Sequence, residues 1–316
     1  MKVGLIDVDG HNYPNLPLMK LSAWHKQQGD SVEWYEPLFS GHCDRVYLSK
    51  VFSFTHDYSS PIDADEVFRG GTGYCIENIN GREVFHSERD KALPQEIEHI
   101  YPDYSLYKNC KDTAYGFLTR GCPRGCSFCH VEAKEGKRSI KVADLSEFWH
   151  GQKNIVLCDP NLIACKDWKE LLQQLIDSRA KVDFNQGIDI RLMTEEKAEM
   201  LKRIRIDSVH FAWDNYEDKE MIVPRFKTFA EVTKWSERKM GVYVLTNFNT
   251  TIDQDLERIY TLRDLGYNPY VMIYDKEHTR IGDTIRRLQR YVNNRLIFHS
   301  VPRFEDYNSK YKTGCK

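Results

Sequence analysis

Short apolar runs separated by polar turns, together with one helical pattern, mark the first 87 residues. Leu18, Leu21 and Trp24 recur at three-residue spacing, which predicts a helix that ends near Gly29. Strands that alternate with a helix in this way predict a small doubly wound, Rossmann-like domain over residues 1–87. The apolar runs assigned to its sheet are Lys2–Val8, Ser31–Tyr35, Arg45–Val51 and Glu66–Arg69.

Residues 88–112 break this pattern. The segment carries Pro94 and Pro102 and an aromatic stretch, Tyr101-Pro102-Asp103-Tyr104, without a sustained period. Proline disfavours both helix interiors and central strands. We therefore expect a linker that packs on another part of the protein.

A second and longer alternation covers residues 113–300 and leaves 301–316 as a C-terminal tail. The runs expected to form strands are Tyr115–Thr119, Ile155–Cys158, Val182–Phe184, Val209–Trp213, Val242–Leu245 and Tyr270–Tyr274. The helical patterns between them are Asp144–His150, Trp168–Ile176, Glu195–Ile204, Phe226–Arg238 and Leu256–Leu265. Six strands separated by helices predict an α/β fold with a parallel six-stranded sheet or partial barrel. Chemistry in such folds lies at the carboxyl ends of the strands.

Composition narrows the class of protein. The chain has 316 residues, a formal net charge of −2 and 29% charged residues, which is typical of a soluble protein and not of one that coats nucleic acid. We expect no membrane span, because no apolar run approaches about 18 residues. The start MKVGLIDVDG lacks the features of a secretory signal, so we expect a cytoplasmic location. Nine cysteines in a reducing compartment then need an explanation other than disulfides.

The clearest chemical motif follows the first strand of the second alternation. Cys122, Cys126 and Cys129 have the spacing C-x3-C-x2-C on a loop rich in glycine and proline. Three thiolates on one loop can bind three irons of a [4Fe–4S] cluster and leave the fourth iron open to a small molecule. The alternative is a zinc site with His130 or a distant cysteine as fourth ligand, although the sequence has no second C-x2-C pair.

This motif resembles the signature of the radical S-adenosylmethionine (SAM) enzymes, in which an aromatic residue precedes the third cysteine. Phe128 stands at that position. The resemblance covers about residues 113–300 and implies a partial (β/α) barrel. It also implies that SAM binds the open iron and is cleaved reductively, and that the 5′-deoxyadenosyl radical removes hydrogen from a substrate. A low-potential electron donor such as flavodoxin or ferredoxin would then be a partner.

Polar residues follow several predicted strands and are candidates for contacts with SAM. Asp159 and Asn161 resemble an Asp-x-Asn variant of the family segment that binds the SAM amino group, and Arg191 is suited to its carboxylate. The other candidates are Gln186, Asp189, Asp214, Thr246 and Asn247. Ordinary roles compete with these: Asn161 as a turn or helix cap, Arg191 in an ion pair with Asp189, and the others as loop caps.

The first domain partly resembles cobalamin-binding domains. Asp9-Gly10-His11, then Ser49-Lys50-Val51, then Gly70-Gly71 follow the order of their Asp-x-His-x-x-Gly, Ser-x-Leu and Gly-Gly elements. Pro14 stands where a glycine is expected, and Val51 replaces a leucine. His11 is therefore either a cobalt ligand or an ordinary turn residue, and the domain is either a cobalamin site or a vestige of one.

Two further features leave alternatives open. Cys43, Cys75 and Cys110 could hold a second cluster, as in methylthiotransferases, whereas Cys158, Cys165 and Cys315 are most simply small apolar residues or a tail thiol. The arginines of the pattern 283–295 could contact phosphates or form a solvated helix face.

Together these features predict an enzyme that binds a [4Fe–4S] cluster and SAM. Its substrate is open between a peptide, a nucleic acid and a small molecule, and no catalytic side chain is identified. The alternatives are a cobalamin-dependent radical SAM methyltransferase and a non-catalytic iron–sulfur binding or sensing protein.

Overall fold

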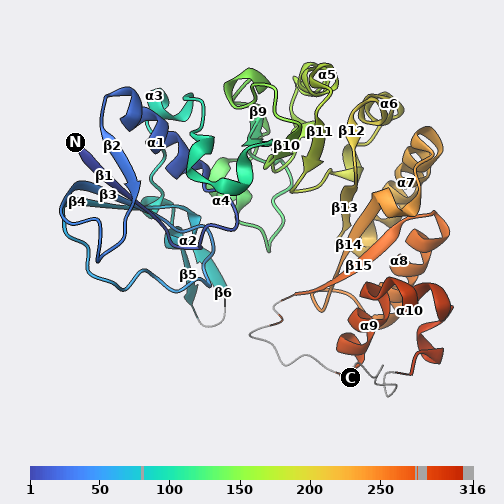
Figure 1. The fold of residues 1–316 in the computed structure, drawn as a ribbon. Coiled ribbons are helices and arrows are strands. Elements are labelled where there is room, and N and C mark those ends of the chain that lie inside the picture. Colours follow the sequence, from blue (N-terminus) through green and yellow to red (C-terminus); the bar gives the residue numbers. More distant parts are fainter. Residues whose placement is uncertain (80–81, 275, 277–282, 309–316) are drawn as a thin grey trace. The chain divides into compact units, whose positions relative to one another are not determined.

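The computed structural model describes residues 1–79, 82–274, 276 and 283–308. The chain divides into two compact units, Met1–Asn185 and Gln186–Lys316 (Figure 1). The first unit therefore contains the predicted small domain, the linker and the first half of the second alternation. Cys315 and the tail beyond residue 308 lie outside the described residues.

A parallel sheet of order β2-β1-β3-β4 opens the first unit. Its strands are β1 (Lys2–Asp7), β2 (Ser31–Trp34), β3 (Cys43–Ser49) and β4 (Ala64–Gly70). Helix α1 (Leu16–Gln27) packs Leu18 and Leu21 against Val3 and Leu5 on one face of this sheet. Asn15 caps that helix by accepting a hydrogen bond from the Leu18 amide. The expected strands and helix are therefore confirmed.

The segment after β4 contains elements that the sequence pattern did not predict. Helix α2 (Thr72–Cys75) leads into an antiparallel hairpin of β5 (Ile76–Ile79) and β6 (Arg82–Phe85). Short helical turns then occupy the predicted linker, namely η1 (Ser87–Arg89), α3 (Gln95–Glu98), η2 (Tyr104–Leu106) and η3 (Lys108–Cys110). Ile97 and Tyr107 are buried against the first sheet and α1, so the linker packs as expected.

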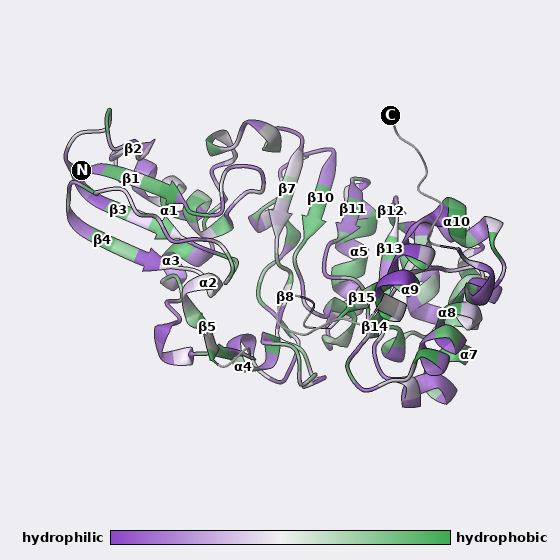
Figure 2. Cartoon of the chain, turned by 90° about the horizontal axis from the view of Figure 1, so that it is seen from below, coloured by the Kyte–Doolittle hydropathy of each residue, from purple (hydrophilic) through white to green (hydrophobic). Residues whose placement is uncertain are grey.

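The rest of the first unit carries a second parallel group, with β10 (Asn154–Leu157) between β7 (Thr113–Gly116) and β11 (Lys181–Phe184). Figure 2 shows β10 and β1 as predominantly hydrophobic strands. The other elements here are β8 (Thr119–Arg120), α4 (Val131–Glu135), β9 (Ile140–Lys141), η4 (Leu145–Glu147), η5 (Leu162–Ala164) and α5 (Trp168–Ser178). Strands β8 and β9 pair antiparallel and enclose the cysteine loop.

The helix predicted over Asp144–His150 is wrong. Only the single turn η4 forms there, closed by a capping box between Asp144 and Glu147. Phe148 then leaves the helical path and packs on Gly116, where an added Cβ would lie only 2.4 Å from its ring. Packing against β7 has therefore overridden the helical spacing of the apolar residues.

The second unit contains the parallel strands β13 (Val209–Trp213), β14 (Met240–Thr246) and β15 (Asn268–Ile273) in that order. Predicted helix Phe226–Arg238 is displaced: α7 spans Lys219–Thr233, contains Pro224 and ends where Lys234 adopts a positive φ of 54°. The other elements are η6 (Ile190–Leu192), α6 (Glu195–Arg203), β12 (Arg205–Ile206), η7 (Tyr216–Asp218), η8 (Glu237–Lys239), α8 (Ile252–Asp264), α9 (Asp283–Asn293), α10 (Arg295–Ser300) and η9 (Phe304–Asp306).

The α/β class with parallel sheets is thus confirmed. The six strands of the second alternation occur as one hydrogen-bonded group of three in each unit. A single six-stranded partial barrel is not established by this pairing and stays a prediction. Among the described residues, no helix is both long and apolar enough to cross a bilayer.

Candidate functional site

Two glycines shape the loop that carries the cysteine motif. Gly121 has a φ of +86°, and a Cβ added there would lie 2.2 Å from the Arg138 carbonyl oxygen, so only glycine fits. Gly125 also has a positive φ, of 58°. The Cys129 amide donates a hydrogen bond of 2.9 Å to the Cys126 carbonyl and closes the last turn of the motif. These constraints fold the three cysteines onto one compact loop.

The thiols of this loop are accessible, unlike most others in the chain. Cys122 and Cys126 are half-buried and Cys129 is exposed. No group of three or more His, Cys, Asp or Glu in the described residues converges on a point where a single metal ion could bind. A cubane cluster makes a different demand, because each of its cysteine ligands binds a separate iron. Three accessible thiols on a glycine-shaped loop fit that donor set.

His130, the other zinc-ligand candidate, faces the β5–β6 hairpin. Its Nε2 lies 3.3 Å from the Glu83 carboxylate, and its ring lies 6.4 Å from the Phe85 ring. Glu83 also accepts a hydrogen bond of 2.5 Å from the Ser53 hydroxyl. The hairpin therefore connects the end of the first sheet with the cysteine loop within the first unit.

Asp159, at the carboxyl end of β10, holds the strand that leads into the cysteine loop. Its carboxylate accepts hydrogen bonds from the Leu118 amide (3.1 Å), the Thr119 amide (2.5 Å) and the Thr119 hydroxyl (2.7 Å). The side chain is 4% exposed, and this burial raises its pKa to about 6. The contact of Asp159 with SAM stays a prediction, whereas the structure gives this residue a positioning role.

Asn161 lies directly against the first cysteine of the motif. Its side-chain amide donates to the Cys122 sulfur at 3.5 Å, and its backbone carbonyl accepts from the Ser139 hydroxyl at 2.9 Å. Asn161 also stands at the N-cap position of η5, where its backbone carbonyl accepts from the Ala164 amide at 3.2 Å, but no side-chain hydrogen bond caps that turn. Hydrogen bonds to ligand sulfurs tune the potential of an iron–sulfur cluster, so Asn161 is well placed for that role.

Replacing Asp159 with asparagine should destabilise the entry to this loop. The substitution puts an NH2 donor where an acceptor now faces backbone amides, and a buried unsatisfied donor costs about 1–3 kcal/mol. We expect the free energy of unfolding in urea to fall by about 2 kcal/mol and the iron content after reconstitution to fall with it. Asp112→Asn, an exposed carboxylate paired with Lys153, is the matched control. Unfolding curves that coincide for both variants and the wild type would contradict this role for Asp159.

In the second unit, Asp189 and Arg191 form an ion pair. The Arg191 Nε donates to the Asp189 carboxylate at 2.8 Å, and the same carboxylate caps η6 by accepting from the Arg191 amide at 3.1 Å. Arg191 also lies 3.8 Å from Asp218. The ion-pair alternative is thus confirmed, and the predicted contact of Arg191 with the SAM carboxylate stays untested beside it. Gln186 is exposed.

Gly187 shapes the backbone next to β13. Its φ is +81°, and an added Cβ would lie 2.8 Å from the His210 carbonyl oxygen. The next amide, of Ile188, donates to that same oxygen at 2.8 Å. The glycine therefore allows the backbone to pack closely on β13.

The three candidates at the ends of β13 and β14 differ in their surroundings. Thr246 is fully buried and donates its hydroxyl to the Met272 carbonyl, and the Asn247 amide donates to the Tyr274 carbonyl, both at 3.2 Å. These two side chains tie β14 to β15. Asp214 is half-buried, and burial raises its pKa while the charges of Arg191 and Arg258 oppose that shift. No described residue donates a hydrogen bond to the Asp214 carboxylate, which makes it the most available candidate of the three.

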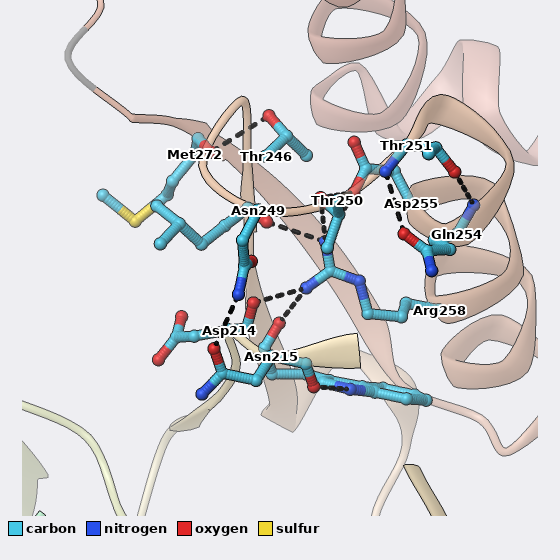
Figure 3. A network of polar contacts seen from close by, with 12 residues as sticks. Asp214, Asn215, Thr246, Asn249, Thr250, Thr251, Gln254, Asp255, Arg258 and Met272 are labelled. Carbon is cyan, nitrogen blue, oxygen red and sulfur yellow. Dashed lines mark hydrogen bonds and ion pairs between the residues drawn. The ribbon is translucent and has the colours of Figure 1, made fainter. Parts of the chain in front are cut away.

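A buried arginine that sequence reasoning missed organises these strand ends (Figure 3). The Arg258 guanidinium donates to the carbonyls of Trp213 (2.5 Å), Asp214 (3.1 Å) and Leu245 (2.7 Å), which end β13 and β14. It also pairs with the Asp255 carboxylate at 2.5 Å, and neither side chain is more than 1% exposed. The available signal was the i, i+3 spacing of two opposite charges on the buried face of α8.

The cobalamin-like pattern does not fit a corrinoid site, because its polar groups already bond within the first unit. The Asp9 carboxylate accepts hydrogen bonds from the Val51 amide (2.5 Å) and the Thr55 hydroxyl (2.6 Å). The imidazole of His11 stacks on the Trp34 ring, with 4.2 Å between ring centroids. A Cβ on Gly71 would lie 2.3 Å from a backbone oxygen, so this glycine serves chain packing.

The linker also occupies the end of β1. Tyr107, 3% exposed, donates its hydroxyl to the Asp7 carboxylate at 2.6 Å. Burial raises the pKa of Asp7 to about 6, and the hydroxyl of Tyr107 opposes that shift. The carboxyl edge that a corrinoid would need is therefore filled by an aromatic residue at β1.

The second-cluster hypothesis is not supported. Cys43 packs with Ile6 and Val46, whereas Cys110 packs in a different core group with Met19. Burial raises the pKa of the thiols of Cys43, Cys75 and Cys110, the last to about 11. These three cysteines are small core residues in separate places.

The arginines of α9 serve at least partly to hold the chain after it. Arg287 donates hydrogen bonds to the Phe304 carbonyl at 2.9 Å and to the Tyr307 carbonyl at 2.6 Å. Arg286 and Arg290 are exposed, in keeping with a solvated helix face. The phosphate-contact alternative is thereby limited to those two residues.

No protein-family model matches this chain, and no curated protein matches it. The features that indicate a function are therefore the spacing of the cysteines, the glycines that shape their loop and the polar side chains around it.

Proposed function

We propose that the chain is a radical SAM enzyme that binds one [4Fe–4S] cluster through Cys122, Cys126 and Cys129. The observation that carries the proposal is the C-x3-C-x2-C motif with Phe128, borne on a loop whose thiols are accessible while the cysteines elsewhere are mostly buried. Three ligands leave one iron open, which is where SAM would bind. When bound and reduced, the cluster supplies the electron that cleaves SAM to methionine and a 5′-deoxyadenosyl radical.

The chain's own residues hold and surround this site. Asp159 fixes the backbone before the loop, and the Asn161 amide contacts the Cys122 sulfur. For SAM itself we propose that Asn161, next to the Cys122 sulfur, contacts the amino group, as the resemblance implies.

The cellular setting follows from the same proposal. A cluster that reduces SAM needs a low-potential electron donor, for which we propose flavodoxin or ferredoxin in the cytoplasm. The substrate gives up a hydrogen atom to the 5′-deoxyadenosyl radical.

Formation of 5′-deoxyadenosine tests the proposed function. Protein reconstituted anaerobically with iron and sulfide should show brown absorbance, bind about four irons and, with dithionite and SAM, release 5′-deoxyadenosine and methionine in equal amounts. Omission of dithionite is the control, because cleavage requires the electron. A reconstituted protein that binds four irons and yet releases neither product would contradict the proposal and leave an iron–sulfur binding protein.

A further inference from the structure

One face of the sheet in the second unit is packed, and the other carries rings. Phe211 and Trp213 of β13 pack on Phe226 of α7, with ring centroids 5.8 and 6.4 Å away. Val242 of β14 and Val271 of β15 are also fully buried. Helices α7 and α8 cover this face of the strands (Figure 1). The residues that alternate with these side chains must point to the opposite face.

On the opposite face, residues that are paired across β13, β14 and β15 lie in rows. His210, Gly241 and Asn268 form the first row, and Ala212, Tyr243 and Tyr270 form the second, nearer the carboxyl ends. Leu245 and Met272 continue the face in a third row. Tyr270 and Met272 are each 46% exposed. Large side chains that are exposed together on one face of a sheet are typical of a binding surface.

The rings on this face form a corner. The His210 imidazole and the Tyr243 ring are stacked, with centroids 5.3 Å apart and planes at 14°. Tyr270 stands at 90° to Tyr243, with centroids 5.8 Å apart. A planar ring of a ligand could therefore make an offset-stacked contact with one ring of this corner and an edge-to-face contact with another.

Small residues keep this corner in place and open. A Cβ on Gly241 would lie 2.7 Å from the Cδ2 of His210, so the absent side chain is what allows the imidazole to lie across β14. The His210 carbonyl is held from the other side by the Ile188 amide at 2.8 Å. Ala212, which is exposed, leaves space next to Tyr243 in the second row.

We propose that this face binds a planar heteroaromatic ring and that the ring belongs to the substrate. Stacking surfaces favour a planar ligand, and the imidazole, the two tyrosine hydroxyls and Asn268 place polar groups around it, which favours a ring with a polar edge over a plain hydrocarbon. The ring contacts lie in the rows before the carboxyl ends of β13, β14 and β15. The assignment to the substrate rests on the proposed function, whereas ring binding itself needs neither electron nor SAM.

Ligand-observed NMR on the full, reconstituted chain tests the inference. The probes are guanosine, uridine, tryptophan and nicotinamide, with ribose as a control that lacks a planar ring. We expect saturation transfer to at least one ring and none to ribose. Tyr270→Ala should weaken that binding about tenfold or more, and Tyr270→Phe should retain it, because stacking needs the ring and not the hydroxyl. Ala212→Leu, which fills the space beside Tyr243, should also abolish binding. Phe54→Ala removes an aromatic residue of the first unit that is more exposed than Tyr270, 73% against 46%, and should change nothing.

Three results of this experiment would overturn the inference. It fails if none of the four probes binds, if Tyr270→Ala binds as the wild type does, or if SAM displaces the probe, since displacement would assign these rings to the adenosyl group. The same preparation is assayed for 5′-deoxyadenosine. Ring binding without SAM cleavage would contradict the proposed function alone, and SAM cleavage without ring binding would contradict this inference alone.

Discussion

Replacing Cys126 with alanine should abolish SAM cleavage altogether. A [4Fe–4S] cluster held by three cysteines loses a third of its protein ligands, and the middle position of the motif has no substitute thiol on the loop. We expect the reconstituted variant to lose the brown absorbance, to bind less than one iron per chain and to form 5′-deoxyadenosine at least about a thousandfold more slowly. Absorbance, iron analysis and chromatographic product assays measure the three effects.

Cys165→Ala provides the matched control for this variant. Cys165 is 1% exposed and lies outside the motif, so its removal should cost only a small buried side chain and the weak hydrogen bond of its thiol to Asp167 at 3.9 Å. Its cluster content and SAM cleavage should stay within about twofold of the wild type. Equal loss in both variants would show that the damage is general. A Cys126→Ala protein that cleaves SAM at the wild-type rate would rule out the proposed ligand set.

Short-range patterns predicted the strands well, for a physical reason. The run Lys2–Val8 forms β1, in which Val3–Asp7 are all buried, and burial on both faces of a parallel sheet favours apolar residues along the whole run. The β5–β6 hairpin escaped prediction because its strands are short and exposed positions dominate them, so no alternating pattern develops. The predicted helix Asp144–His150 does not form, although its apolar residues have helical spacing, because Phe148 packs on Gly116 instead.

At the candidate site, the sequence predicted the cysteine ligands but not the partners of the polar residues that follow the strands. Spacing alone located the three cysteines, because several ligands must come from one loop to hold one cluster. Spacing could not tell whether a polar residue after a strand faces a ligand or a neighbouring strand. Thr246 and Asn247 turn out to bond across to the end of β15, and Asp159 to the strand before the cysteines. Those partners lie 26 to 41 residues away in sequence, beyond any local pattern.

Arg258→Met should cause the largest loss of stability among single substitutions in the second unit. The change removes the donor to three strand-end carbonyls (Figure 3). It leaves the Asp255 carboxylate buried, with the Thr250 hydroxyl still donating to it at 2.6 Å. Burial already raises the pKa of Asp255 and lowers that of Arg258, so each charge depends on the other. Breaking a buried ion pair typically costs about 3–5 kcal/mol, which is the expected fall in the free energy of unfolding in urea.

Two further variants separate the charge from the carbonyl contacts. Adding Asp255→Asn to Arg258→Met removes the uncompensated carboxylate, so part of the loss should return, while the carbonyls of Trp213 and Leu245 still lack their donor. Lys227→Met breaks an exposed pair with Glu231, whose atoms are 4.0 Å apart, and should cost less than about 1 kcal/mol. If Arg258→Met costs no more than Lys227→Met, then Arg258 does not hold the strand ends. If the double variant is as unstable as the single one, the carbonyl contacts and not the ion pair carry the effect.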